Sequence, residues 1–127
     1  MGISLTNLAN PKARGFSVNF WHWRALVEAV RRLNVLPDAR VDGLHDPFCG
    51  NGLTQEEAAR VADALETQLL PTLGDDQRVL LDGNLTSEPD DSTLHRGEDA
   101  HRNYSTNREV LFTFIQFLRE CRGFEVD

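Results

Sequence analysis

The sequence predicts a mainly α fold of the α+β class, in which about three packed helices join one or two short strand pairs and a long acidic loop. Apolar side chains recur with helical spacing in three segments, near residues 19–34, 54–70 and 106–122. Short runs of alternating apolar and polar residues favour strands near the N-terminus and before Asp82. The length of 127 residues indicates one globular domain over residues 1–127.

The segment at 106–122 is the most apolar of the three, and we expect the other elements to pack around it. Its core-facing positions follow the i, i+3, i+4, i+7 rule, at Leu111, Phe114, Ile115 and Leu118. Thr106 and Glu109 have the spacing of a capping box, which predicts that Thr106 caps this helix. Gly123 follows the last turn and can adopt the left-handed conformation that ends a helix, so Phe124 should fold back onto it.

Two short extended segments are expected before the first helix. Residues 3–8 alternate weakly and favour a short strand. A second alternation starts at Phe16 and leads to Asn19, whose side chain can cap a helix. From Asn19 onward the apolar positions recur with helical spacing until Pro37 stops the pattern, which predicts the helix at 19–34.

The segment at 35–52 is rich in Pro and Gly and is predicted to be mainly loop. One helical turn is expected near residues 38–44, and Leu44 should anchor the segment to the core. Gly50, Asn51 and Gly52 are expected to form a turn with left-handed backbone angles, because glycine and asparagine tolerate that conformation.

The helix at 54–70 has clear signals at both ends. Thr54 and Glu57 have capping-box spacing, and Pro71 closes the segment. Between these ends lies an apolar stripe with helical spacing, at Ala58, Val61, Ala62, Leu65 and Leu69. We therefore expect one face of this helix to pack against the core.

The segment that follows changes character within a few residues. Residues 78–81 favour a short strand, and the Asp82–Gly83 dipeptide is a strong signal for a hairpin turn. Beyond it the chain becomes polar and acidic as far as residue 103. We expect the stretch from Glu88 to Asp99 to be mostly exposed, because its composition offers little apolar area to bury.

The charge of the chain limits the classes of partner that it can bind. The formal net charge is −7, from 20 acidic and 13 basic residues, which argues against a nucleic-acid partner. A protein partner is expected, and a basic one fits this charge better than an acidic one. The sequence has no apolar run long enough for a membrane span and no signal peptide, so a cytoplasmic location without membrane contact is the default expectation.

One cluster of potential metal ligands lies in the acidic segment. His95, Glu98, Asp99 and His101 place imidazoles and carboxylates within seven residues of one another, and such ligands can bind a divalent ion. Their spacing matches no established zinc motif, so a solvated acidic loop explains them better. A small metal-dependent enzyme that uses this loop is the alternative function; otherwise we expect no metal and no cofactor.

Catalysis by a cysteine has little support in the sequence. Cys49 can in principle pair with a distant histidine, but the residues around it form no signature of an activated nucleophile. Cys49 and Cys121 do not form a secreted disulfide framework, and burial as small apolar side chains is expected for both. No catalytic residue is predicted.

The run Trp21-His22-Trp23-Arg24 is the most distinctive local feature. Successive helical residues are rotated by about 100°, so Trp21 and Trp23 cannot both face the core, and Trp23 belongs to the apolar face. Trp21 then lies near solvent, with His22 and Arg24 on other flanks of the helix. These three residues are the predicted partner-binding residues, because exposed Trp and Arg dominate protein-binding hot spots. The alternative is that Trp21 only covers an edge of the core.

These observations favour a non-enzymatic protein-interaction module. Immunity proteins and antitoxins are small acidic domains that neutralise basic partners, and this chain is like them in charge and size only. The sequence specifies neither the partner nor the oligomeric state.

Overall fold

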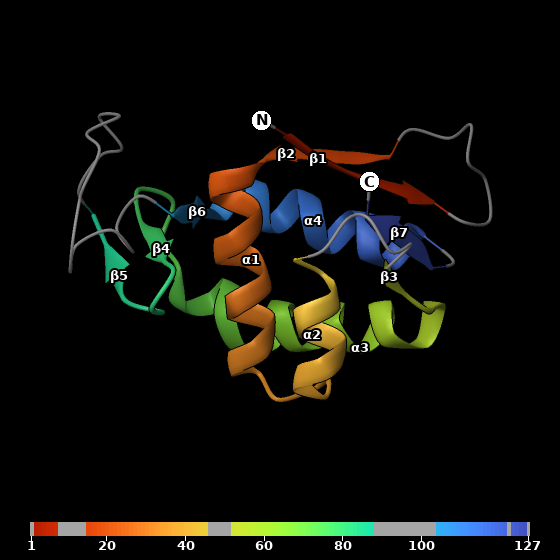
Figure 1. Ribbon diagram of the computed structural model, residues 1–127. Helices are drawn as coiled ribbons and strands as arrows, with labels where there is room; N and C mark the ends of the chain where they lie inside the picture. The colour runs from red at the N-terminus through yellow and green to blue at the C-terminus, as the bar shows by residue number, and fades with distance from the viewer. Residues whose placement is uncertain (1, 8–14, 46–51, 88–103, 122, 127) are drawn as a thin grey trace.

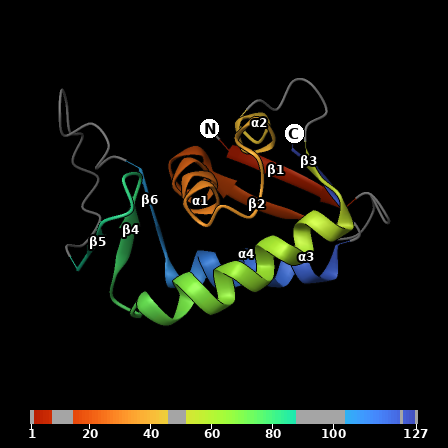
Figure 2. The same ribbon diagram turned by 90° about the horizontal axis from the view of Figure 1, so that it is seen from below.

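The structure is a computed structural model that describes residues 2–7, 15–45, 52–87, 104–121 and 123–126. It belongs to the α+β class, with α1 and α2 on one side of a helix pair formed by α3 and α4 (Figures 1 and 2). Within the described residues the elements are, in chain order, β1 (Gly2–Asn7), β2 (Phe16–Asn19), α1 (Phe20–Arg32), α2 (Asp38–Gly43), β3 (Gly52–Leu53), α3 (Gln55–Ala64), the π-helical turn η2 (Leu65–Leu69), the 3-10 turn η3 (Leu70–Thr72), β4 (Arg78–Leu80), β5 (Leu85–Thr86), β6 (Ser105–Asn107), α4 (Arg108–Glu120) and β7 (Phe124–Val126).

The strands form two small antiparallel sheets. One has the order β2-β1-β7-β3, with Ile3 opposite Val18 and Leu5 opposite Val126, and the other has the order β5-β4-β6. Figure 1 shows the three-stranded sheet at one end of the molecule, and strands β1 and β2 of the four-stranded sheet above α4. The prediction of a mainly α fold is therefore confirmed only in part. The expected one or two strand pairs were too few, because β3, β6 and β7 have two or three residues each and show no recognisable alternation.

Helix α1 forms where the sequence predicts it and is shorter than the expected range 19–34. The Oδ1 of Asn19 accepts a hydrogen bond from the backbone N–H of His22 at 2.9 Å, which confirms the predicted cap. The helix ends at Arg32 because Asn34 has a φ of 57°, which belongs to the left-handed region. Its buried face lies against β1, β2 and β6, and Trp23 on this face contacts Phe114 of α4.

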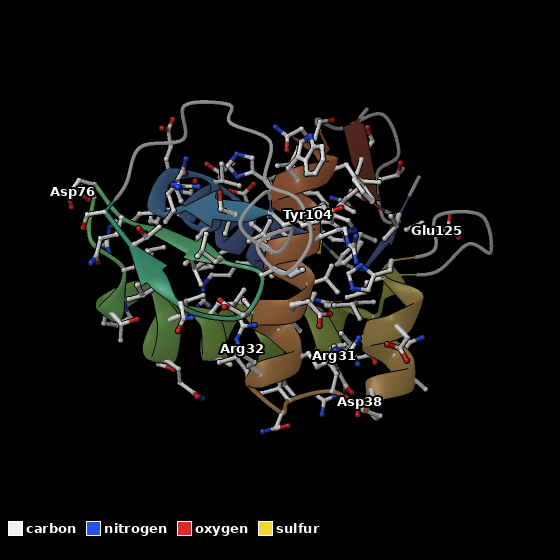
Figure 3. All side chains as sticks on the ribbon, turned by 60° about the vertical axis from the view of Figure 1, so that its left-hand side comes forward. Arg31, Arg32, Asp38, Asp76, Tyr104 and Glu125 are labelled. Carbon is white, nitrogen blue, oxygen red and sulfur yellow. The ribbon has the colours of Figure 1, made fainter. Side chains whose placement is uncertain are left out.

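Helix α2 is the single helical turn expected near residues 38–44, and α1 holds it in place. Arg31 donates hydrogen bonds to the carboxylates of Glu28, Asp38 and Asp42, so one guanidinium joins the two helices (Figure 3). The indole N–H of Trp23 donates to the carbonyl of Leu44 at 2.9 Å. A six-residue helix is not stable by itself, so these contacts are what keep it folded.

The predicted capping box of α3 is present. Thr54 Oγ1 accepts from the N–H of Glu57, and the Glu57 carboxylate accepts from the N–H of Thr54. Arg40 of α2 donates to both oxygens of that carboxylate and to the carbonyl of Gly52. The predicted range 54–70 is helical almost throughout, although it widens into η2 and ends as η3 rather than stopping at Pro71.

Helix α4 is central, as the sequence predicts, but its cap is not Thr106. The helix begins at Arg108, and the Oδ1 of Asn107 accepts a hydrogen bond from the N–H of Val110 at 2.9 Å. Thr106 belongs to β6, where its backbone is paired with Val79 and its side chain is fully buried. The predicted capping box with Glu109 was therefore wrong, since β6 continues for one residue beyond Thr106.

The end of α4 confirms part of the expected geometry. The helix ends at Glu120 rather than residue 122, and Cys121 is already extended. Gly123 has a φ of 97°, as predicted, and turns the chain into β7. The ring of Phe124 then packs against that of Phe117 with a centroid distance of 5.8 Å.

None of the described helices has the length and apolar character that crossing a membrane requires.

Candidate functional site

The N-terminal end of α1 carries a group of side chains that we call the Trp21 cluster, which consists of Phe20, Trp21, Arg24 and Tyr104. Trp21 is 42% exposed, whereas Trp23 is 1% exposed. The difference follows from the helical rotation between the two positions, which turns Trp23 into the core and leaves Trp21 at the surface. Trp21 is therefore available for contact with another molecule.

The rings of the cluster support one another. Trp21 lies against Tyr104 with a centroid distance of 4.8 Å, and the edge of Phe20 completes the group at 6.5 Å from Trp21 and 6.3 Å from Tyr104. The guanidinium carbon of Arg24 lies 4.5 Å above the Tyr104 centroid and 5.7 Å from that of Phe20. These distances are in the range of cation–π contacts, so the rings hold the charged group in one place.

The backbone positions the two halves of the cluster. Asn19 caps α1 and so places Phe20 and Trp21 in its first turn. Tyr104 precedes β6, and its carbonyl accepts a hydrogen bond from the N–H of Leu81 at 3.0 Å. Strand β6 lies beside α1. Tyr104, the residue before β6, therefore lies next to α1 (Figure 3).

Two of the three predicted binding residues lie together at this surface, and the third points towards β6. Trp21 and Arg24 both contact Tyr104. The side chain of His22 is half-buried, and its Nδ1 lies 3.1 Å from the Oγ1 of Thr106. His22 therefore joins α1 to β6 beneath the cluster. Tyr104 was not identified from the sequence, because its role depends on pairing between segments far apart in the chain.

Arg24 differs from most of the other described arginines in its hydrogen bonding. Four of them pair with a carboxylate, namely Arg31, Arg40, Arg108 and Arg119. Two more donate to oxygen atoms of the protein, Arg32 to the carbonyl of Leu81 and Arg78 to Ser105 Oγ. Within the described part of the chain no residue accepts a hydrogen bond from Arg24, as is also true of the exposed Arg60, but the guanidinium of Arg24 lies over the rings of Tyr104 and Phe20.

The residues considered for metal binding lie outside the described part of the chain. His95, Glu98, Asp99 and His101 belong to residues 88–103, as does the acidic stretch expected to be exposed. The metal-dependent alternative therefore stays a prediction. Among the residues that the structure describes, no three His, Cys, Asp or Glu side chains are grouped so that they could hold a metal ion.

Burial was expected for both cysteines, and the structure describes one of them. Cys49 also lies outside the described residues. Cys121 is buried, and its Sγ donates to the carbonyl of Leu118, as expected for a small core side chain. Burial raises the pKa of the Cys121 thiol, so the nucleophilic thiolate is disfavoured.

A cleft of about 600 Å³ lies between β2 and α4. Its described lining is Gly15, Phe16, Ser17, Thr113, Gln116, Phe117 and Glu120. The described lining offers one carboxylate and no imidazole or thiol, so the described residues there do not include an acid and base pair. The cleft is therefore a weaker candidate than the Trp21 cluster.

The Trp21 cluster is thus the described surface with the most specific arrangement of side chains. It combines an exposed indole, a phenol and a guanidinium that are held by contacts between α1 and the residue before β6. Compared with protein-family models, curated proteins and solved structures, the chain matches none of them.

Proposed function

We propose that this chain is a non-enzymatic protein-interaction module that binds a protein partner through the Trp21 cluster. The observation that carries the proposal is the exposure of Trp21 beside a second ring and an arginine. Trp, Tyr and Arg are the residues that dominate protein-binding hot spots. Because Trp21 and Arg24 both contact Tyr104, a binding surface explains these three side chains better than the chance exposure of a single aromatic residue.

The order of the cluster also favours binding. A side chain that is already held in place loses little conformational entropy when a partner covers it. Trp21 is held by Tyr104, and the helix turn that carries it is fixed by the Asn19 cap. His22 supports this turn from beneath through Thr106, so we assign it a positioning role rather than direct contact.

The net charge of −7 favours a partner that is neutral or basic overall. Opposite charges speed the encounter between two proteins, and salt screens this attraction. The association rate with such a partner should fall as the salt concentration rises. The charge acts over distance and does not itself select the residues that touch.

The experiment is an affinity capture from the cell that makes the protein, with three versions of the chain as bait. These are the wild type, Trp21→Ala and Phe112→Ala. Phe112 is the matched control, because it is an aromatic residue on α4 with a similar exposure of 48%. Bound proteins are quantified by mass spectrometry after all three baits are shown to be folded by circular dichroism.

The proposal expects at least one protein that binds the wild type and Phe112→Ala but is lost with Trp21→Ala. A truncated hot-spot residue typically weakens binding by about 2 kcal/mol or more, which is a loss of about 30-fold. If every captured protein binds all three baits equally, the Trp21 cluster is not the contact surface.

A further inference from the structure

We infer that Arg24 is the receptor for a carboxylate of the partner, supplied by an Asp or Glu side chain next to an apolar side chain that packs on Trp21. This inference rests on the proposed function and adds the chemistry of the partner's contact residues. The inference depends on two features of the Arg24 guanidinium: its lack of an acceptor among the described residues and its position beside Trp21.

The contacts of Arg24 leave its hydrogen-bond donors available. A guanidinium is planar, and its five N–H groups lie in the plane at the edge of the group. The rings of Tyr104 and Phe20 hold it at 4.5 Å and 5.7 Å, and neither ring supplies an oxygen acceptor in these contacts. Within the described residues no side-chain or backbone oxygen accepts from it. The rings therefore hold a cation without satisfying its donors.

A partner that packs on Trp21 lies within reach of Arg24, because the two residues are three positions apart on α1 and both contact the Tyr104 ring. Covering Arg24 removes water from its N–H groups. A buried charged donor without an acceptor is costly, so a stable complex needs an oxygen at this place. A carboxylate supplies two oxygens in the geometry of the guanidinium fork and cancels its charge.

Four of the seven other described arginines pair with a carboxylate, which makes it the commonest acceptor for an arginine in the described chain. Arg40 pairs with Glu57 at 2.5 Å, and Arg31 and Arg119 each bind two or more carboxylates. Arg24 is half-buried, and no described carboxylate takes that position beside it. The partner would therefore complete at Arg24 the pairing that the chain makes internally elsewhere.

The charge balance favours a carboxylate over a phosphate group. A phosphate group carries up to two negative charges, and Arg24 supplies one positive charge. The chain has a net charge of −7, so the second charge would meet repulsion rather than a partner cation. A single Asp or Glu side chain matches the single guanidinium. It can be part of a partner that is basic overall, since only its local position matters.

The experiment selects peptides from a random phage-displayed library against the full chain and measures their binding by fluorescence anisotropy. Each enriched peptide is tested on the wild type, Trp21→Ala, Arg24→Gln and Arg24→Lys. It is also made with its Asp or Glu replaced by Asn or Gln, and with phosphoserine at that position. Circular dichroism of every variant shows whether the fold is kept.

We expect the enriched peptides to contain an acidic residue beside an apolar one. Arg24→Gln and the neutral peptide should each bind about tenfold more weakly, and combining them should cost little more than either alone, because both remove the same contact. Arg24→Lys should restore only part of the affinity, since an ammonium lacks the fork.

Three results would overturn the inference. If Trp21→Ala abolishes binding while Arg24→Gln binds normally, the carboxylate contact is wrong and the proposed function stands. If a phosphoserine peptide binds about tenfold more tightly than the acidic one, the ligand is a phosphate group. If no enriched peptide depends on Trp21, both the inference and the proposed function are wrong.

Discussion

The Nδ1 of His22 lies 3.1 Å from the Oγ1 of Thr106, across 84 positions of the chain. This contact joins the first turn of α1 to β6, and β6 leads directly into α4. The three consecutive residues of β6 have three different structural roles. Ser105 pairs with Leu80 in the sheet, Thr106 contacts α1, and Asn107 caps α4. The surface at Trp21 is thus held by the same strand that starts the central helix.

The first prediction separates the roles of Asn107 and Thr106. Asn107→Ala removes the cap of α4 and should lower the free energy of unfolding by about 1 kcal/mol. Thr106→Val keeps the shape of the buried side chain but removes its hydrogen bond to His22, and should also cost about 1 kcal/mol.

Hydrogen exchange of the Val110 amide distinguishes the two variants, because this amide donates to Asn107. Exchange should be faster in Asn107→Ala and unchanged in Thr106→Val under conditions where both remain folded. If Thr106 were the cap, Thr106→Val would instead speed exchange of the Glu109 amide, and Asn107→Ala would leave the Val110 amide unchanged.

The second prediction concerns the core position of α4. Phe114 is 2% exposed and its ring lies 5.3 Å from that of Phe16 and 5.8 Å from that of Trp23. Phe114→Ala should therefore cost about 3–5 kcal/mol in urea denaturation, the usual range for truncating a buried aromatic residue. Phe112→Ala on the same helix should cost at most about 0.5 kcal/mol. Equal losses for the two variants would mean that α4 is rotated from this orientation.

Local signals explain what could be predicted from the sequence. The caps at Asn19 and Thr54 depend on residues three positions away, and helical periodicity depends on residues within two turns. Such patterns are complete within a short segment. At the start of α4 two neighbouring residues can each act as a cap, and the choice of Asn107 over Thr106 is made by the pairing of β6 with β4.

The candidate site shows the same limit. The exposure of Trp21 follows from the rotation between helical positions, so the sequence alone could predict it. Tyr104 contacts Trp21 only because β6 packs beside α1, and no local pattern marks it. The short strands β3 and β7 are also products of tertiary pairing, since Leu53 and Phe124 are neighbours only in the folded chain.

The third prediction is a pH dependence at Glu57. Hydrogen bonds from Arg40, followed by that from the Thr54 N–H, lower the pKa of Glu57 from its ordinary value of 4.5 to about 2. The folded state therefore favours the ionised form. This contribution is fully present above about pH 4.5 and is lost as the pH falls from there towards 2.

The test compares the unfolding free energies of the wild type and Glu57→Gln between pH 7 and pH 2. The variant should be less stable by about 1 kcal/mol at pH 7, because it loses an ion pair that is partly screened by solvent, while a glutamine at this position can still accept from the Thr54 N–H in the capping box. The gap should close as the pH approaches 2. Glu56→Gln is the control in the same turn and should show a much smaller change. A gap that stays constant down to pH 2 contradicts the pairing with Arg40.

The fourth prediction concerns Gly52, which was expected to be part of a left-handed turn. Gly52 instead lies in β3 and is not among the described residues with a positive φ, and Gly50 and Asn51 lie outside the described chain. Its need for glycine comes from a close approach. A Cβ at this position would lie 1.8 Å from the carbonyl oxygen of Phe124.

Gly52→Ala should therefore separate β3 from β7 and cost about 2–3 kcal/mol, since backbone atoms must move. Gly74→Ala is the matched control, because its Cβ would meet flexible side chains rather than backbone, Gln77 at 3.2 Å and Asp76 at 3.5 Å. Thermal unfolding should show a clear loss for the first variant and little change for the second. Equal melting temperatures would mean that β3 does not pair at this distance.

The last prediction compares the two tryptophans and decides whether the binding experiments can be interpreted. Trp23 is buried and donates a hydrogen bond to Leu44, so Trp23→Ala should cost about 3–5 kcal/mol. Trp21→Ala loses a ring contact at the surface and should cost about 0.5–1 kcal/mol. Urea denaturation monitored by circular dichroism measures both losses of stability, because this signal does not depend on indole fluorescence.

The single-tryptophan variants add an independent check. Trp23→Phe leaves Trp21, whose emission should lie at longer wavelength and be quenched by iodide, whereas Trp21→Phe leaves an emission that is blue-shifted and protected. If Trp21→Ala proves as destabilising as Trp23→Ala, Trp21 is part of the core, and a loss of binding in that variant would report unfolding instead of a missing contact.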